Sequence, residues 1–133
     1  MKYANRVLFA LGLLLLAATG AFAQERVIAN VPFGFTAEGH EMPAGKYLVS
    51  EVSDGVKVLA IHNDASNQTL LVNTFSGDPT GETKLTFHRY GETYFLAAVS
   101  TPNSRYELGS SKAEKQLRAK NPGNETIVAV LGQ

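Results

Sequence analysis

Residues 84–100 read KLTFHRYGETYFLAAVS, and this stretch decides the expected fold. Two runs rich in aromatic and β-branched residues flank Gly91, which is the arrangement of a β-hairpin. In the first run, residues 82–90, apolar and polar side chains alternate as in a strand with one buried face. The second run, residues 93–100, is apolar on both faces. Such a strand is covered on both sides, so it belongs near the middle of a sandwich or closed barrel.

Similar short runs recur along the rest of the chain from Gln24 onward, separated by turns rich in Gly, Pro, Asn and Asp. A spacing of roughly eight to twelve residues between strands is typical of an all-β domain. The additional strands are predicted over residues 27–36, 46–53, 56–62, 68–75 and 126–131. The sequence therefore predicts an all-β fold, an antiparallel β-sandwich or small barrel of about seven strands with one short helix near the C-terminus.

Prolines and glycines set the expected turns. Residues 38–45 are predicted as one turn, and Asp54-Gly55 favours a two-residue type I′ turn, because both residues tolerate a positive φ. Pro32 removes a backbone donor from the run 27–36. We therefore expect that strand to lie at a sheet edge or to carry a bulge.

Residues 111–120 are predicted as a helix. Ser111 and Glu114 fit a capping box, and Glu114 can pair with Arg118 one turn later. A helix of about three turns is marginal alone. We therefore expect it to dock on the sheet through Leu117.

Residues 1–23 have the pattern of a secretory signal peptide. Lys2 and Arg6 precede 17 residues without a charge, and the stretch ends in Ala21-Phe22-Ala23. A transmembrane anchor is the alternative, but the apolar run is short for a span and no basic cluster follows it. The sequence predicts cleavage near Ala23, a single β-rich domain over residues 24–133, and a secreted or periplasmic location without a transmembrane anchor.

Composition excludes several classes of function. The expected mature chain holds 10 basic and 12 acidic residues, which is the wrong balance for a nucleic-acid-binding protein. The chain has no Cys, so thiol catalysis, disulfides and thiolate metal sites are excluded. No cofactor is expected. The three histidines, His40, His62 and His88, are too far apart in sequence for a zinc signature, although Glu38 and Glu41 beside His40 give a weak alternative.

The densest polar group of the chain is His88-Arg89-Tyr90. On a strand, Thr86, His88 and Tyr90 share one face, so they form a tentative binding face. The simpler interpretation is that these side chains are the solvent side of a half-buried strand. No catalytic or metal-binding residue is predicted, and the G-x-S-x-G motif of serine hydrolases is absent.

Four segments carry a resemblance to known proteins: VPFGF at residues 31–35, MPAGKY at 42–47, LTFHRYG at 85–91 and SKAE at 111–114. Because these four segments occur in this order, the chain resembles a group of small secreted β-rich proteins that are numerous in soil bacteria and have no established function. The resemblance implies an exported protein and assigns no catalytic residues.

These observations predict a non-catalytic module of the envelope or the extracellular space, with a binding or structural role and an unknown partner. A calyx-like carrier of a small apolar ligand is the alternative, and a small hydrolase is a third. A carrier requires an internal apolar cavity. A binding module instead requires a filled core and an exposed patch.

Overall fold

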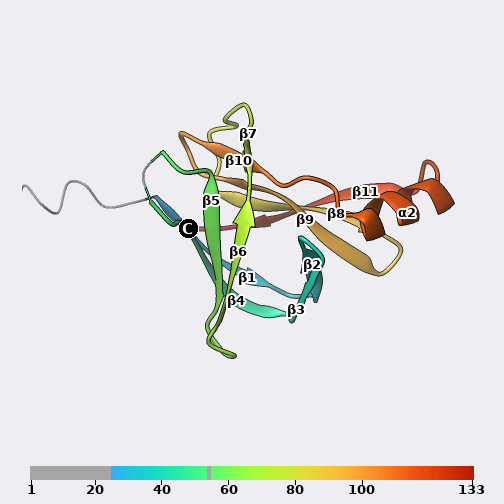
Figure 1. Ribbon diagram of the computed structural model, residues 1–133, viewed down its shortest axis with the longest axis horizontal. Coiled ribbons are helices and arrows are strands. Elements are labelled where there is room, and N and C mark those ends of the chain that lie inside the picture. The colour runs from blue at the N-terminus through green and yellow to red at the C-terminus, as the bar shows by residue number, and fades with distance from the viewer. Residues whose placement is uncertain (1–24, 54) are drawn as a thin grey trace, which may run out of the picture.

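The computed structural model describes residues 25–53 and 55–133, which form two curled β-sheets and one short helix (Figure 1). The predicted all-β class is confirmed: the sheets form a half-barrel, and the helix lies near the C-terminus. The predicted leader lies outside the described residues.

The first sheet has four antiparallel strands, and their inner side chains form one half of the core. Buried and exposed side chains alternate regularly in its outer strand, where Val27, Ala29 and Val31 are buried and the residues between them are exposed. That strand lies at the sheet edge, as Pro32 predicted. The order is β1 (Arg26–Val31), β4 (Gly45–Glu51), β5 (Val58–Asn63) and β6 (Gln68–Asn73).

The second sheet is built around the predicted hairpin. Its apolar strand β9 pairs with β8 along its whole length and with β10 over residues 98–100. Gly91 in the turn has a positive φ of 64°. A two-strand hairpin adds to the free end of β9 through Thr36, which pairs with Phe95 in parallel. The main order is β11 (Glu125–Leu131), β8 (Lys84–Tyr90), β9 (Thr93–Ser100), β10 (Arg105–Glu107) and β7 (Phe75–Ser76), and the added hairpin is β2 (Phe35–Ala37) and β3 (His40–Met42).

Several contacts join the two sheets, and two of them involve the backbone at opposite sides of the half-barrel. The chain leaves β6 and enters β7 of the other sheet through Thr74, which is buried and hydrogen-bonded to the carbonyl of Lys57. On the other side, the backbones of Ile28 and Gln133 exchange two hydrogen bonds of 2.9 and 3.0 Å. These joins hold the curled sheets together as a half-barrel.

The strand predicted over residues 27–36 is broken after Val31, which corrects the prediction. Pro32 has no N–H for the ladder, so pairing stops there and the chain passes to the second sheet. Phe33 then stacks on Tyr94, with ring centroids 3.7 Å apart, and meets the edge of Phe87 at 4.9 Å. The proline therefore moves the aromatic run that follows it into the core.

Three further boundaries differ from the predicted ones. Residues 38–45 contain strand β3, because Glu38 and Gly39 both adopt positive φ and close a tight hairpin. The carbonyl of Ser53 accepts a hydrogen bond from the N–H of Val56, as the predicted turn requires, although Asp54 lies outside the described residues. The next strand, β5, begins only at Val58 instead of the predicted Val56. The strand predicted over residues 68–75 divides between β6 in the first sheet and β7 in the second.

The sequence did not predict strand β10, which pairs with both β9 and β7.

Aromatic rings fill the space between the sheets. Phe35 meets Tyr47 at 5.1 Å and Phe87 at 5.2 Å between centroids, in edge-to-face geometry that favours packing. Tyr47 and Phe87 are fully buried, and the Tyr47 hydroxyl donates to the carbonyl of Pro43. The interior is therefore a packed core.

We predict that Phe87→Ala lowers the free energy of unfolding by about 3 to 5 kcal/mol, because it empties the centre of this ring cluster. Phe75→Ala is the control, since 64% of Phe75 is exposed, and its cost should stay within about 0.5 kcal/mol. Urea unfolding followed by circular dichroism measures both. Equal losses would contradict a core centred on Phe87.

Candidate functional site

The tentative binding face is largely shielded from solvent, and the helix α2 (Lys112–Lys120) lies over two of its residues, His88 and Tyr90. Thr86 and Tyr90 are only 7% and 4% exposed, and His88 is half-buried. The expectation that these three side chains form the solvent side of the strand is therefore wrong. A helix from distant sequence contacts His88 and Tyr90 through Glu114, and Thr86 is buried as well.

The helix docks through a carboxylate instead of the predicted Leu117. Ser111 caps the helix by accepting from the backbone N–H of Glu114 at 3.2 Å, and this half of the capping box is confirmed. The Glu114 side chain points toward the sheet. Glu114 is the buried residue of the helix, whereas Leu117 is half-buried.

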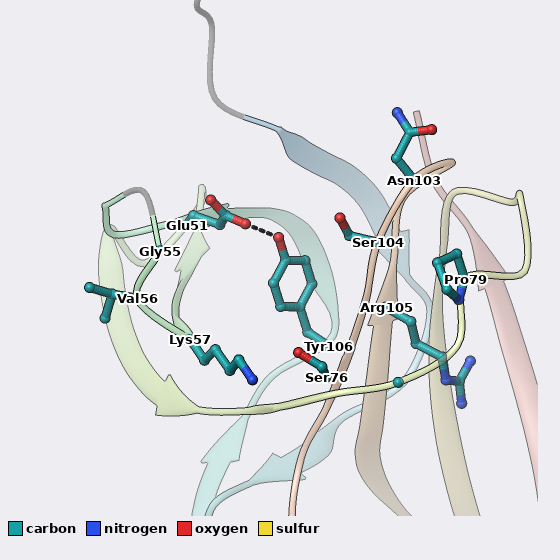
Figure 2. Close-up of a pocket in the computed structure, with 11 residues that line it drawn as sticks. Glu51, Gly55, Val56, Lys57, Ser76, Pro79, Asn103, Ser104, Arg105 and Tyr106 are labelled. Carbon is teal, nitrogen blue, oxygen red and sulfur yellow. Dashed lines mark hydrogen bonds between the residues drawn. The ribbon is translucent and has the colours of Figure 1, made fainter.

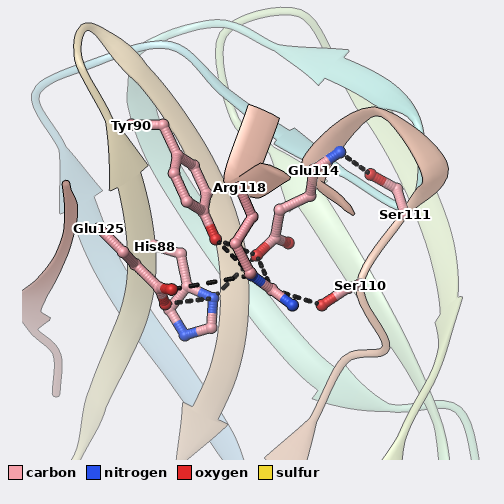
Figure 3. A network of polar contacts seen from close by, with 7 residues as sticks. All are labelled: His88, Tyr90, Ser110, Ser111, Glu114, Arg118 and Glu125. Carbon is pink, nitrogen blue, oxygen red and sulfur yellow. Dashed lines mark hydrogen bonds and ion pairs between the residues drawn. The ribbon is translucent and has the colours of Figure 1, made fainter. Parts of the chain in front are cut away.

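Three donors converge on one oxygen of this carboxylate (Figure 3). Glu114 Oε2 accepts from His88 Nδ1 at 2.9 Å, from the Tyr90 hydroxyl at 3.0 Å and from Arg118 Nη2 at 3.0 Å. Glu125 lies near the same groups, 3.5 Å from His88 and 3.7 Å from Arg118. We call these five residues the Glu114 cluster.

The Glu114 cluster has a defined electrostatic state at neutral pH. Burial raises the pKa of Tyr90 above its ordinary value of 10.0, so the phenol stays neutral. The Tyr90 hydroxyl in turn accepts from Arg118 Nε at 3.1 Å, and this bond raises the pKa of the Arg118 guanidinium. A permanent cation thus faces the buried carboxylate, and the neutral phenol bridges the two.

This arrangement is better suited to fastening α2 to the sheet, a role that we call the latch, than to catalysing a reaction. The Glu114 oxygen is occupied by protein donors, and no member of the cluster lines any of the five surface pockets found among the described residues. The sequence indicated the Glu114–Arg118 pair. It did not indicate the contacts with His88 and Tyr90, which lie 26 and 24 residues from Glu114.

A different surface offers room for a ligand. A pocket of about 310 Å³ opens at the end of the half-barrel, between the β4–β5 connection and the segments around β7 and β10 (Figure 2). Sequence analysis did not find it, because its lining comes from three segments that are far apart in the chain. We call it the Tyr106 pocket; it is lined by Glu51, Gly55, Val56, Lys57, Ser76, Gly77, Pro79, Asn103, Ser104, Arg105 and Tyr106.

The Tyr106 pocket combines an aromatic ring with hydrogen-bonding groups. The Tyr106 hydroxyl donates to the carboxylate of Glu51, which holds the ring in place. The Lys57 ammonium extends toward Ser76 and the ring. Arg105 instead pairs with Glu107 at 3.1 Å, so its charge is partly neutralised. Lys57 makes no ion pair with any other described residue.

The other histidines stay apart from both sites. His40 and Glu41 line an exposed pocket with strand β6, and His62 bonds the Thr69 hydroxyl at 2.8 Å on the outer face of the first sheet. Among the described residues, no three His, Asp or Glu side chains are placed to hold a metal ion. The same residues include no helix with the length and apolarity needed to span a membrane.

Comparison with known proteins adds no relative. No family model matches the chain, and neither a curated protein nor a solved structure matches it significantly.

We predict that Glu114→Ala lowers the free energy of unfolding by about 2 to 3 kcal/mol, because it leaves Arg118 and two buried donors without their acceptor. Amide exchange in α2 should accelerate as the helix loosens. Lys115→Ala, an exposed change on the same helix, should have neither effect. Unchanged helix protection in Glu114→Ala would contradict the latch.

Alkaline pH should weaken the fold through Tyr90. Its pKa is raised in the folded state, so the folded chain holds the phenolic proton more tightly than the unfolded chain does. The contribution is complete below about pH 10 and is lost as pH rises through the higher folded pKa. In Tyr90→Phe, the urea midpoint should therefore fall less steeply above about pH 10 than in the wild type. Some decline should remain, because burial also raises the pKa of Tyr47. An identical decline in both proteins would refute this assignment.

Proposed function

We propose that the protein is an exported, non-catalytic binding module whose ligand occupies the Tyr106 pocket. The observation that carries this proposal is the convergence of Lys57, two serine hydroxyls and the Tyr106 ring on one open pocket. The charged leader and apolar run of residues 1–23 support export.

The packed interior supports a binding module over a carrier. A calyx-like carrier holds its apolar ligand inside the barrel. Here Phe33, Phe35, Tyr47 and Phe87 occupy that space. Five pockets that the described residues form all open to solvent, so binding is expected on the outer surface.

The lining of the Tyr106 pocket favours a hydroxyl-rich ligand that bears a negative charge. An aromatic ring can pack against the apolar face of a sugar, while Ser76, Ser104 and Asn103 can exchange hydrogen bonds with its hydroxyls. Lys57 supplies a cation for a carboxylate. We therefore propose an acidic saccharide of the cell envelope or extracellular matrix as the ligand class.

The state of the Glu114 cluster supports the absence of catalysis. A general base needs room for a substrate within hydrogen-bond reach. The His88 Nδ1 atom bonds Glu114, and α2 lies over that contact. The cluster is better suited to holding the helix than to reacting with a substrate.

Binding can be tested by titration calorimetry with a uronic-acid oligosaccharide and its neutral counterpart. The acidic sugar should bind more tightly, and Lys57→Ala should weaken its binding by about tenfold, the loss of one charge-assisted hydrogen bond. Lys115→Ala, a lysine far from the pocket, should leave binding unchanged.

Two results would overturn the proposal. One is equal affinity of wild type and Lys57→Ala for the acidic sugar. The other is an apolar molecule that copurifies with the protein and is seen by native mass spectrometry, which would support the carrier.

A further inference from the structure

The last strand, β11, has one paired edge and one open edge. On its paired side it follows β8, and just past its end the N–H of Gly132 donates to the carbonyl of Thr83 at 2.9 Å. The next residue, Gln133, points the other way and pairs with Ile28. Backbone groups alternate in direction along a strand. The odd-numbered residues of β11 therefore direct their N–H and C=O groups away from β8.

These outward backbone groups have no partner within the described chain. Ile127, Ala129 and Leu131 lie on the open edge. β1 hydrogen-bonds to this side only through Ile28, although it also lies close to the last residues of β11. Where β1 and β11 separate, a pocket of about 330 Å³ remains, lined by Ile28, Asn30, Lys46 and Leu131 among others. The open edge thus has space beside it.

Side chains do not protect this edge. Proteins usually block open edges with charges, prolines or bulges. Residues 126–131 read TIVAVL and hold neither a charge nor a proline. Ile127 and Leu131 are 69% and 73% exposed, which are the largest exposures among the described bulky apolar residues. By contrast, β1 begins at Arg26 and is followed directly by Pro32.

We propose that β11 pairs antiparallel with β11 of a second copy of this chain. A two-fold axis at Val128 gives the greatest overlap and sets Ile127 opposite Ala129 of the other copy. Both residues direct their backbone groups to the open edge, so each such pair exchanges hydrogen bonds. Val128 and Val130, which are half-buried in the single chain, gain apolar neighbours on the inner face.

Self-pairing also fits the charges at the ends of the strand. In this register Glu125 of one copy lies opposite Leu131 of the other, beside the pocket that Lys46 lines. Lys46 makes no ion pair with a described residue. The acidic strand end therefore lies near a lysine at both ends of the symmetric pair, as an isologous interface requires. This contact adds to those that Glu125 makes with His88 and Arg118 of its own chain at 3.5 and 3.7 Å.

Sedimentation velocity over a range of protein concentrations tests this pairing. One strand pair buries less surface than a standard interface, so we expect a dissociation constant in the micromolar range. Ile127→Lys places a charge on the edge and should weaken dimerisation by at least about tenfold. The matched control is Leu71→Lys, the same change at a residue 58% exposed on the other sheet, which should dimerise like wild type.

Hydrogen exchange gives a readout that needs no variant. The amides of Ile127, Ala129 and Leu131 should become protected as the protein concentration rises, while exposed amides elsewhere do not. If Ile127→Lys misfolds by circular dichroism, Ala129→Pro replaces it, because it removes an outward N–H and no bond to β8. A monomer throughout the range, a dimer insensitive to the β11 variants, or loss of the dimer in Leu71→Lys would each overturn the proposal.

Discussion

The aromatic cluster between the sheets is the interaction on which the rest of the structure depends. Two curled sheets enclose a space that aliphatic side chains from the strands alone do not fill, and Phe33 and Phe35 enter it from the segment that follows Pro32. Phe87 meets both rings. With no cysteine in the chain, no disulfide can replace this packing. The filled core also leaves no internal space of the kind that a carrier needs, which is why we propose a ligand site on the outer surface.

The position of the helix follows from the same second sheet. The outer face of β8 carries His88 and Tyr90, whose polar atoms would be costly to bury without partners. Glu114 satisfies both at once, and Arg118 balances its charge. The helix therefore docks by polar complementarity. This explains how a helix with a narrow apolar stripe can still hold a fixed place on the half-barrel.

Much of the local structure could be predicted from the sequence, because it depends on neighbouring residues. The helix boundaries, the Ser111 cap, strand β9 and the edge position of β1 all follow from periodicity and capping chemistry. The remaining features depend on contacts between distant segments. Nothing near His88 and Tyr90 in the sequence indicates that a helix from residues 112–120 will contact them. Likewise, the Tyr106 pocket forms between three segments that come together only in the folded chain.

The join between Ile28 and Gln133 has a consequence for folding kinetics. The two residues are about a hundred positions apart, and β11 pairs with a strand about forty positions earlier. Folding dominated by such distant contacts is slow, because chain entropy is lost before these contacts form. A chain that folds slowly remains unfolded for longer after synthesis. The export that we propose would benefit from this delay, because a chain is threaded through a translocation channel before it acquires tertiary structure.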